Sequence, residues 1–316
     1  MYHRIAPDEA PRDTAQPAFQ PNRSLIVSAG AFNEQMAYLS RHCNCLSLPQ
    51  AIDYLKSGRL PHRSVVVTFD DGYLDNLTIA LPILKAHGIP ATVYVTTGLI
   101  SQDASLWWYE LEQCIATNVE LNFMWRNQNY RFVMAGHLEK QESYIFLNRM
   151  LKNMDLNEQN EFMNQLHCKA RVKFKYSDLV LHRQHLSRLA AEPLITIGAH
   201  THNHPVLSRL SNILLRREVG HSRELLQSWT KRPVTHLAYP FGDKQQADKR
   251  EFEVARELGF ESAVTTRLGH LHSFHRNHLF ALPRVAIDDQ DCMARFEWKL
   301  SGLYCLVKRP LSRIRI

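Results

Sequence analysis

Residues 64–72 read Ser64-Val65-Val66-Val67-Thr68-Phe69-Asp70-Asp71-Gly72, a hydrophobic run that ends in two acidic residues and a glycine. Five β-branched or hydroxyl residues and a phenylalanine predict a buried strand over 64–69. The glycine lets the backbone turn where the strand ends. Neighbouring side chains on a strand point to opposite sides, so Asp70 and Asp71 can do two different jobs in one small site. A surface turn, where Asp and Gly are common, is the alternative interpretation.

A second strand followed by polar residues lies far downstream. Residues 194–199 predict another buried strand, and the sequence His200-Thr201-His202-Asn203-His204-Pro205 follows it. Neutral imidazole is the commonest metal ligand in proteins. If the segment forms a helical turn, His200 and His204 share one face, while His202 points elsewhere. With one Asp oxygen they form a two-His, one-carboxylate set with open positions, as a catalytic metal needs. A chance cluster among 17 histidines is the alternative.

These motifs resemble those of the polysaccharide deacetylases with a NodB-homology domain. The first family motif, Thr-Phe-Asp-Asp-Gly, is matched at 68–72, and the second, His-(Ser/Thr)-x-x-His-Pro, at 200–205. The third centres on Pro-aromatic-Gly after a strand and is matched by Tyr239-Pro240-Phe241-Gly242. The match covers most of the chain in the expected order, and the first two motifs together are specific.

Strand-like and helix-like segments alternate along the chain, which favours an α/β fold with a parallel sheet. The resemblance implies an irregular (β/α) barrel of about seven strands, with the chemistry at the C-terminal strand ends. We expect one domain over 1–316, with a helical insertion at 101–190 on the rim of the site. Trp107 and Trp108 in this insertion either stack on sugar rings or, more commonly for such aromatics, anchor it to the core. The predicted strands lie near 25–27, 64–69, 91–97, 194–199, 235–239, 261–266 and 281–287.

The resemblance also implies the roles at the site. Asp71, His200 and His204 are the expected ligands of a divalent metal ion, with zinc as the default and other divalent ions able to fit. The metal activates an acetamido carbonyl, which is a poor electrophile, towards hydrolysis. Asp70 is the expected general base. The third motif, Tyr239, Pro240 and Phe241, is expected beside the substrate, with a backbone N–H near Phe241 helping to hold the oxyanion.

Two of the departures from the family pattern concern the residues expected beside the metal ligands. Many members carry an Arg two residues before the third-motif Pro, where this chain has Ala238. We expect Arg284, at the end of a late predicted strand, to replace it beside Asp70; a structural salt bridge is the alternative. The family's usual Asp-Trp motif is not visible either.

The second departure is at the start of the chain. In a subset of the family a first strand ends in Tyr-His and that His enters the site, so His3 is the candidate general acid. The strand before Tyr2 is missing, and a frayed terminal residue is the alternative. We therefore expect the true start to lie upstream of Met1.

Length and composition limit the kinds of protein that fit this sequence. The 316 residues are 45% hydrophobic and 22% charged, which is typical of a globular protein. No apolar run predicts a membrane span or a signal peptide, and six scattered cysteines favour a reduced, cytoplasmic protein. The prediction of a cytoplasmic location is less well supported if residues are missing upstream.

The net charge of +7 is concentrated in a basic tail at 303–316, which is either a solvated segment or a loose contact with an anionic membrane. No nucleic-acid motif accompanies it, so nucleic acid is not an expected partner.

The leading interpretation is a metal-dependent polysaccharide deacetylase that hydrolyses N-acetyl groups on a cell-surface glycan, an exopolysaccharide or its precursor. An O-acetyl esterase or a deformylase acting on a sugar would use the same site. A non-catalytic glycan-binding relative is the alternative of a different class. The further histidine clusters at 182/185 and 270–278 are interpreted as surface or rim residues.

Overall fold

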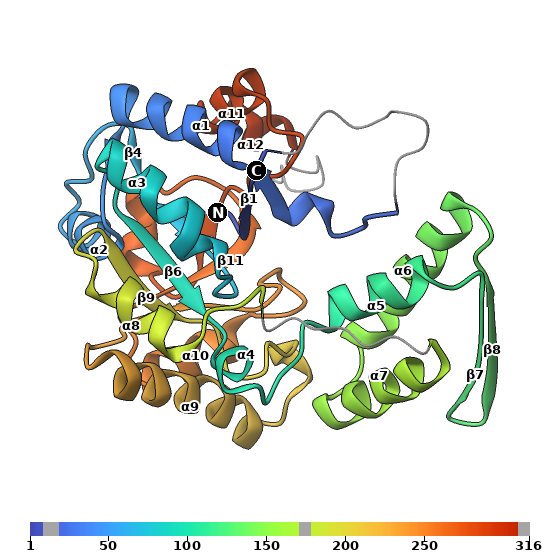
Figure 1. Ribbon diagram of the computed structural model, residues 1–316. Helices are drawn as coiled ribbons and strands as arrows, with labels where there is room; N and C mark the ends of the chain where they lie inside the picture. The colour runs from blue at the N-terminus through green and yellow to red at the C-terminus, as the bar shows by residue number, and fades with distance from the viewer. Residues whose placement is uncertain (9–18, 171–177, 309–316) are drawn as a thin grey trace.

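The computed structural model describes residues 1–8, 19–170 and 178–308. Its main body is a parallel sheet wrapped by helices, and a smaller group of helices with a hairpin lies to one side (Figure 1). The buried hydrophobic residues form one large cluster in the main body and a second cluster centred on the smaller group.

The main sheet of the described chain has six strands in the order β12-β11-β10-β9-β6-β5, and all neighbours are parallel. The predicted α/β barrel-like fold is therefore confirmed. A parallel sheet covered on both faces explains why its strands are almost continuously buried. The strands are β5 (Val67–Phe69), β6 (Ala91–Val95), β9 (Ile195–Ala199), β10 (His236–Ala238), β11 (Ser262–Leu268) and β12 (Leu282–Arg284).

Four short strands lie beside this sheet in two parallel pairs. The segment predicted at 25–27 is β2 (Ile26–Ser28), which pairs with β1 (Arg4–Ala6) and does not enter the main sheet. The segment predicted at 64–69 is interrupted at Val66, and its first part, β4 (Ser64–Val65), pairs with β3 (Asn44–Cys45).

The first two residues bridge the gap between β5 and the segment after β12. The amide of Tyr2 donates to the Thr68 carbonyl at 2.8 Å, and its carbonyl accepts from the Asp70 amide at 3.1 Å. On the other side Met1 donates to the Val285 carbonyl at 2.9 Å. Met1 and Tyr2 thus occupy the position of a further strand at the level where β5 ends.

The helices of the main body bury one side against the sheet. In α1 the buried residues Phe32, Met36 and Leu39 recur at helical spacing, which turns one stripe towards the sheet. After α3 and α10, Gly88 and Gly259 adopt left-handed conformations that end the helices. The helices are α1 (Ala29–His42), α2 (Leu48–Lys56), α3 (Leu81–His87), α4 (Thr97–Ser101), α8 (Arg183–Ala191), α9 (Asn212–Thr230), α10 (Lys249–Glu257), α11 (Met293–Leu300) and α12 (Leu303–Lys308). Short helical turns cover Arg23–Leu25, Asn76–Ala80, Leu207–Arg209 and Ser273–Asn277.

The insertion consists of α5 (Trp107–Ala116), α6 (His137–Lys152) and α7 (Leu156–Ala170), together with an antiparallel hairpin of β7 (Glu120–Trp125) and β8 (Gln128–Val133). The prediction that the insertion is helical is therefore wrong for the hairpin. Burial alternates along β7, the two-residue period of a half-buried strand. The turn residues Arg126 and Asn127 both have positive φ, as a two-residue hairpin loop requires. Helix α8, also predicted within the insertion, packs on β9 and α9 of the main body.

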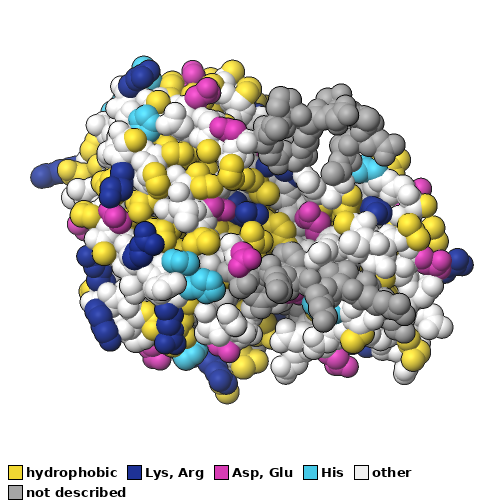
Figure 2. All heavy atoms as spheres, in the orientation of Figure 1, with side chains coloured by type: hydrophobic (Ala, Val, Ile, Leu, Met, Phe, Trp, Pro, Cys, Tyr) yellow, Lys and Arg dark blue, Asp and Glu magenta, His cyan; other side chains and the backbone are white. Residues whose placement is uncertain are grey.

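The surface carries charges of both signs. Lys and Arg side chains are scattered over the visible face, with Asp and Glu between them (Figure 2).

Within the described residues, no helix combines the length and apolar character needed to cross a membrane. None of the six cysteines, all of which lie in the described part of the chain, forms a disulfide. Residues 309–316 of the predicted basic tail lie outside the described residues.

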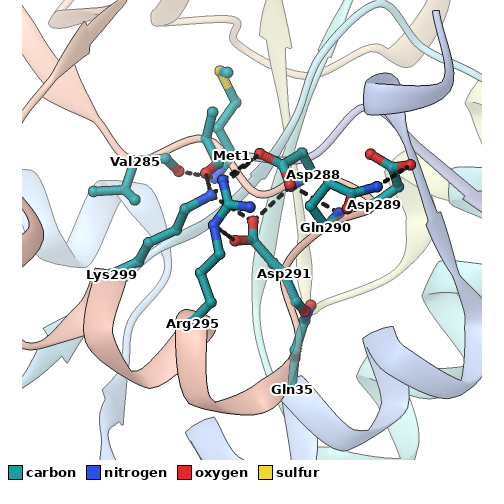
Figure 3. Close-up of polar contacts among 10 residues, drawn as sticks. Met1, Gln35, Val285, Asp288, Asp289, Gln290, Asp291, Arg295 and Lys299 are labelled. Atoms are coloured by element: carbon teal, nitrogen blue, oxygen red, sulfur yellow. Dashed lines mark hydrogen bonds and ion pairs between the residues drawn. The ribbon is translucent and has the colours of Figure 1, made fainter. Parts of the chain in front are cut away.

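A buried ion pair fixes the segment after β12. The Lys299 ammonium of α11 lies 2.5 Å from Asp291 Oδ2 and donates to the Ala286 carbonyl at 2.9 Å. Arg295 reaches the other carboxylate oxygen at 3.0 Å. These side chains converge next to Met1 (Figure 3). Because Lys299 and Asp291 are both buried, removing either partner leaves an uncompensated charge.

We expect Asp291→Ala to lower the free energy of unfolding by about 3 kcal/mol, since Lys299 then stays buried without its main partner. Chemical denaturation followed by tryptophan fluorescence measures this. Glu297→Gln, at an exposed position of the same helix, is the control and should change stability by less than about 0.5 kcal/mol. Equal effects of the two variants would contradict the role given to the buried pair.

Candidate metal centre

The residues predicted at the site lie where strands of the main sheet end. Asp70 and Asp71 follow β5, His200 follows β9, and Arg284 is the last residue of β12. The carboxyl ends of parallel strands meet at one edge, so residues far apart in sequence come together there.

Three buried side chains form a group that could hold a metal ion. His200 Nε2 and His204 Nε2 each lie 3.3 Å from Asp71 Oδ1, and the three potential ligand atoms are all within 4.8 Å of one another. Within the described structure, Asp71 Oδ1 is buried and accepts no hydrogen bond. A buried carboxylate oxygen without a hydrogen-bond donor suits a cation, and two imidazoles with one carboxylate suit a first-row divalent ion. The group therefore fits the predicted metal.

The two histidines are oriented by different means. His200 Nδ1 lies 2.8 Å from the Ala238 carbonyl, and since a carbonyl only accepts, this nitrogen carries the proton. The lone pair of His200 is then on Nε2, which faces Asp71. The ring of His204 lies between the rings of Trp108 and Phe241, with centroids 5.0 and 4.9 Å away. Aromatic packing therefore holds His204 in place.

The segment 200–204 is a loop, so the helical turn that would have placed His200 and His204 on one face does not form. Thr201 and His204 have positive φ values of 64° and 55°, which fold the backbone back on itself. The rings of His200 and His204 still converge, with centroids 4.9 Å apart. His202 points elsewhere, as predicted, and its Nδ1 lies 2.9 Å from Thr97 Oγ1.

Asp70 has a separate partner. Two nitrogens of the Arg284 guanidinium lie 2.7 Å from the two carboxylate oxygens of Asp70, and both residues are buried. Arg284 also donates from Nε to the Thr265 carbonyl at 2.9 Å, which fixes its plane. Burial would raise the pKa of Asp70, but the Arg284 guanidinium, together with the neighbouring His200 and His3, outweighs this effect and holds that pKa below its usual value. The ion pair expected from the sequence is present, and it keeps Asp70 ionised.

The carboxyl group of Asp71 is also held in its charged form. Burial acts to raise its pKa, and in the absence of a metal ion the neighbouring His200 and His204 imidazoles, where they are protonated, more than offset this effect. The pKa of Asp71 therefore lies well below its usual range. An ionised carboxylate is the form that binds a metal.

His3 lies within electrostatic reach of both carboxylates. Burial lowers the pKa of His3, while Asp71 and Asp70 act in the opposite direction. Its carbonyl accepts a hydrogen bond from Asn76 Nδ2 at 2.9 Å, and Tyr2 before it is hydrogen-bonded to β5. His3 is thus fixed beside the site and is not a frayed terminal residue.

The third motif is only partly at the site. Tyr239 is fully buried, and its hydroxyl donates to the Phe280 carbonyl at 3.1 Å, so the prediction that it faces the substrate is wrong. The chain reverses after Pro240, where Phe241 has a φ of 58°. Phe241 borders the group through its contact with His204. Side chains on either side of Pro240 therefore point in different directions.

The tryptophans at the start of the insertion are buried, with 3% of Trp107 and 6% of Trp108 exposed. Trp108 donates from Nε1 to the Tyr73 hydroxyl at 3.3 Å. This burial favours the anchoring role over stacking on a sugar.

Sequence reasoning missed Glu218 and Lys152. Glu218 of α9 is buried and accepts hydrogen bonds from the second-motif loop. The ammonium of Lys152, at the end of α6, lies 4.8 Å from the centre of the Phe241 ring. Glu218 falls in the same stripe of α9 as the buried Leu215 and Val219, and an acidic residue in an apolar stripe is a signal that could have revealed it.

The other histidine clusters lie outside this group, and the prediction of surface or rim positions holds for His272 and His278, which are exposed, but not for His275, which is buried. His185 Nδ1 accepts from the His182 amide, and His275 Nδ1 accepts from the His272 amide, so both pairs cap their own short helices. Among the described residues, only Asp71, His200 and His204 gather closely enough to hold a metal ion.

Comparison with known proteins gives a family and a fold. The family model described as polysaccharide deacetylase matches residues 57–263. A Staphylococcus aureus poly-beta-1,6-N-acetyl-D-glucosamine N-deacetylase is 37% identical over 82 residues, which is 26% of this chain and 28% of that protein. The enzyme of the same name from Staphylococcus epidermidis is 30% identical over 102 residues, covering 31% and 35%. The matches thus span about a third or less of these relatives.

Two solved structures share the fold over nearly the whole chain. The Streptococcus pyogenes deacetylase PplD in complex with acetate has a TM-score of 0.58 at 20% identity, covering 95% of this chain and 96% of that one. A de-N-acetylase from Aggregatibacter actinomycetemcomitans has a TM-score of 0.59 at 15% identity, covering 94% and 97%.

We expect the purified protein to bind one divalent ion per chain, and His200→Ala to remove tight binding, because one of three ligands is lost. Metal content after dialysis, measured by mass spectrometry, tests this. The matched control is His202→Ala, which removes an imidazole of the same loop that points away from the group. Equal metal loss in both variants would show that the ion does not lie at Asp71.

Proposed function

The chain belongs to the polysaccharide deacetylase family, and we propose that it hydrolyses N-acetyl groups on the sugars of a cell-surface glycan, an exopolysaccharide or its precursor. One observation carries this proposal: two adjacent buried carboxylates have separate partners. Asp71 faces two imidazoles, and Asp70 is held by Arg284. One carboxylate is thus available as a metal ligand and the other as a base.

The side chains can divide the reaction between them. An ion held by Asp71, His200 and His204 would supply Lewis acidity towards the acetyl carbonyl and towards water. Asp70, kept ionised by Arg284, accepts the proton of the attacking water as its oxygen bonds to the acetyl carbon. The carbon–nitrogen bond then breaks, and a proton donated by His3 reaches the leaving nitrogen. The products are acetate and a free amino sugar.

The proposed metal is zinc, which accepts two imidazole nitrogens and a carboxylate oxygen and leaves a position open. The proposed substrate is an N-acetylated hexosamine polymer, and the names of the staphylococcal relatives support an N-acetyl group over an O-acetyl or formyl group.

Purified protein should release acetate from N-acetylglucosamine oligomers, and a chelator should stop the release. Asp70→Asn should lower the rate by about 10²–10⁴-fold, because the base is lost while the metal ligands remain. Asp53→Asn, at an exposed position of α2, is the control. Release from O-acetylated or N-formylated sugars, with none from N-acetylated ones, would contradict the proposed substrate.

Arg284→Ala should shift the acid limb of the kcat/KM–pH profile to higher pH. Arg284 holds the pKa of Asp70 down and burial pushes it up, so Asp70 without Arg284 becomes ionised only at higher pH. Arg284→Lys keeps the charge and should shift the limb less. Profiles that coincide for wild type and Arg284→Ala would leave Arg284 with a structural role only.

A further inference from the structure

We propose that Glu218 is a positioning residue that sets the metal affinity of the site by holding the loop that carries His204. This inference rests on the metal centre of the proposed function and concerns a residue outside its motifs. Glu218 touches none of the three metal-ligating side chains in the hydrogen bonds described, so its effect passes through the backbone of residues 202 and 203.

The loop needs external support because its backbone is unusual. Thr201 and His204 are both left-handed, a region that side chains disfavour and that β-branched residues such as Thr rarely enter. Such conformations persist only where surrounding contacts fix them. Inside the loop, the His204 amide donates to Thr201 Oγ1 at 3.1 Å, which closes the turn.

Glu218 satisfies the donors on one side of the loop. Its Oε2 accepts from the His202 amide at 3.2 Å and from the Asn203 amide at 2.8 Å, and its Oε1 accepts from Asn203 Nδ2 at 2.6 Å. The three described hydrogen bonds to this carboxylate all come from the loop. Only 6% of Glu218 is exposed, so bonds to its charge are stronger than they would be in water.

The start of α4 satisfies the acceptors on the other side. The Thr97 amide donates to the Thr201 carbonyl at 3.2 Å, and the Gly98 amide donates to the His202 carbonyl at 2.7 Å. A Cβ atom at Gly98 would lie 2.5 Å from that carbonyl oxygen, so the approach depends on glycine. The loop is thus clamped between backbone donors of α4 and one carboxylate of α9. His204 follows directly after the clamped residues, and its direction towards Asp71 depends on them.

The test is the Zn²⁺ affinity of Glu218→Gln, measured by competition with a chromophoric chelator. The glutamine side chain has the shape of glutamate but not its charge, and its NH2 group cannot accept a hydrogen bond. We expect the Kd for Zn²⁺ to rise about 10–100-fold, the usual effect of removing a group that orients a metal ligand. The absorption bands of bound Co²⁺ should also shift, because His204 becomes less well placed. Glu224→Gln, exposed on the same helix, is the matched control and should leave the Kd for Zn²⁺ and the Co²⁺ absorption bands unchanged.

Thermal unfolding of the metal-free proteins separates positioning from general stability. A lower Tm of metal-free Glu218→Gln with an unchanged Kd for Zn²⁺ would overturn the proposal. If that variant does not fold, Asn203→Ala decides instead, because it removes only the bond to Oε1. It should raise the Kd by a smaller factor, and an unchanged Kd overturns the proposal. Metal binding is measured without substrate, so the two proposals can fail separately. A wild-type protein that binds Zn²⁺ but releases no acetate would contradict the proposed function and leave the proposed role of Glu218 intact.

Discussion

The burial of two adjacent carboxylates is the constraint on which the rest of the site depends. Asp70 and Asp71 are both almost inaccessible, and neighbouring negative charges in a protein interior are costly unless each has its own compensation. Arg284 supplies it for Asp70, and the two imidazoles, with the metal they could hold, supply it for Asp71. These partners come from β9 and β12, so the sheet must bring three distant strand ends to one place.

The main body and the loops have different roles in meeting this constraint. The strands are short and buried, and they fix the positions where the site residues begin. The loops after them are strained: Asp71, Thr201, His204 and Phe241 all have positive φ. Left-handed non-glycine residues at a functional site are retained only where neighbouring contacts support them. The strands thus set where the site residues lie, and the loop conformations determine the directions of their side chains.

Much of the fold could be predicted from periodicity and composition. All seven predicted strands exist, and two helices end next to Gly88 and Gly259, residues that readily adopt a left-handed conformation. The hairpin at 120–133 was not predicted, although burial alternates along β7, because a two-residue period over a six-residue strand is a weak signal between helical segments. Side-chain direction was harder to predict. Tyr239 lies in a recognisable motif but faces the core, and Glu218 lies in no motif but supports the site, because contacts across the fold decide both.

The place of Arg284 follows from the packing inside the barrel. Tyr94 of β6 lies across Gly198 of β9, where a Cβ atom would be only 2.4 Å from its ring, and it packs in one cluster with Ala238 of β10. Small residues at 198 and 238 therefore leave room for a large aromatic ring. A larger side chain at 238 would compete for this space. The Arg284 guanidinium instead lies 5.7 Å from the centre of the Tyr94 ring and reaches Asp70 from β12. The Tyr94 ring packs against the guanidinium, so the position of Arg284 depends on the aromatic side chain at residue 94.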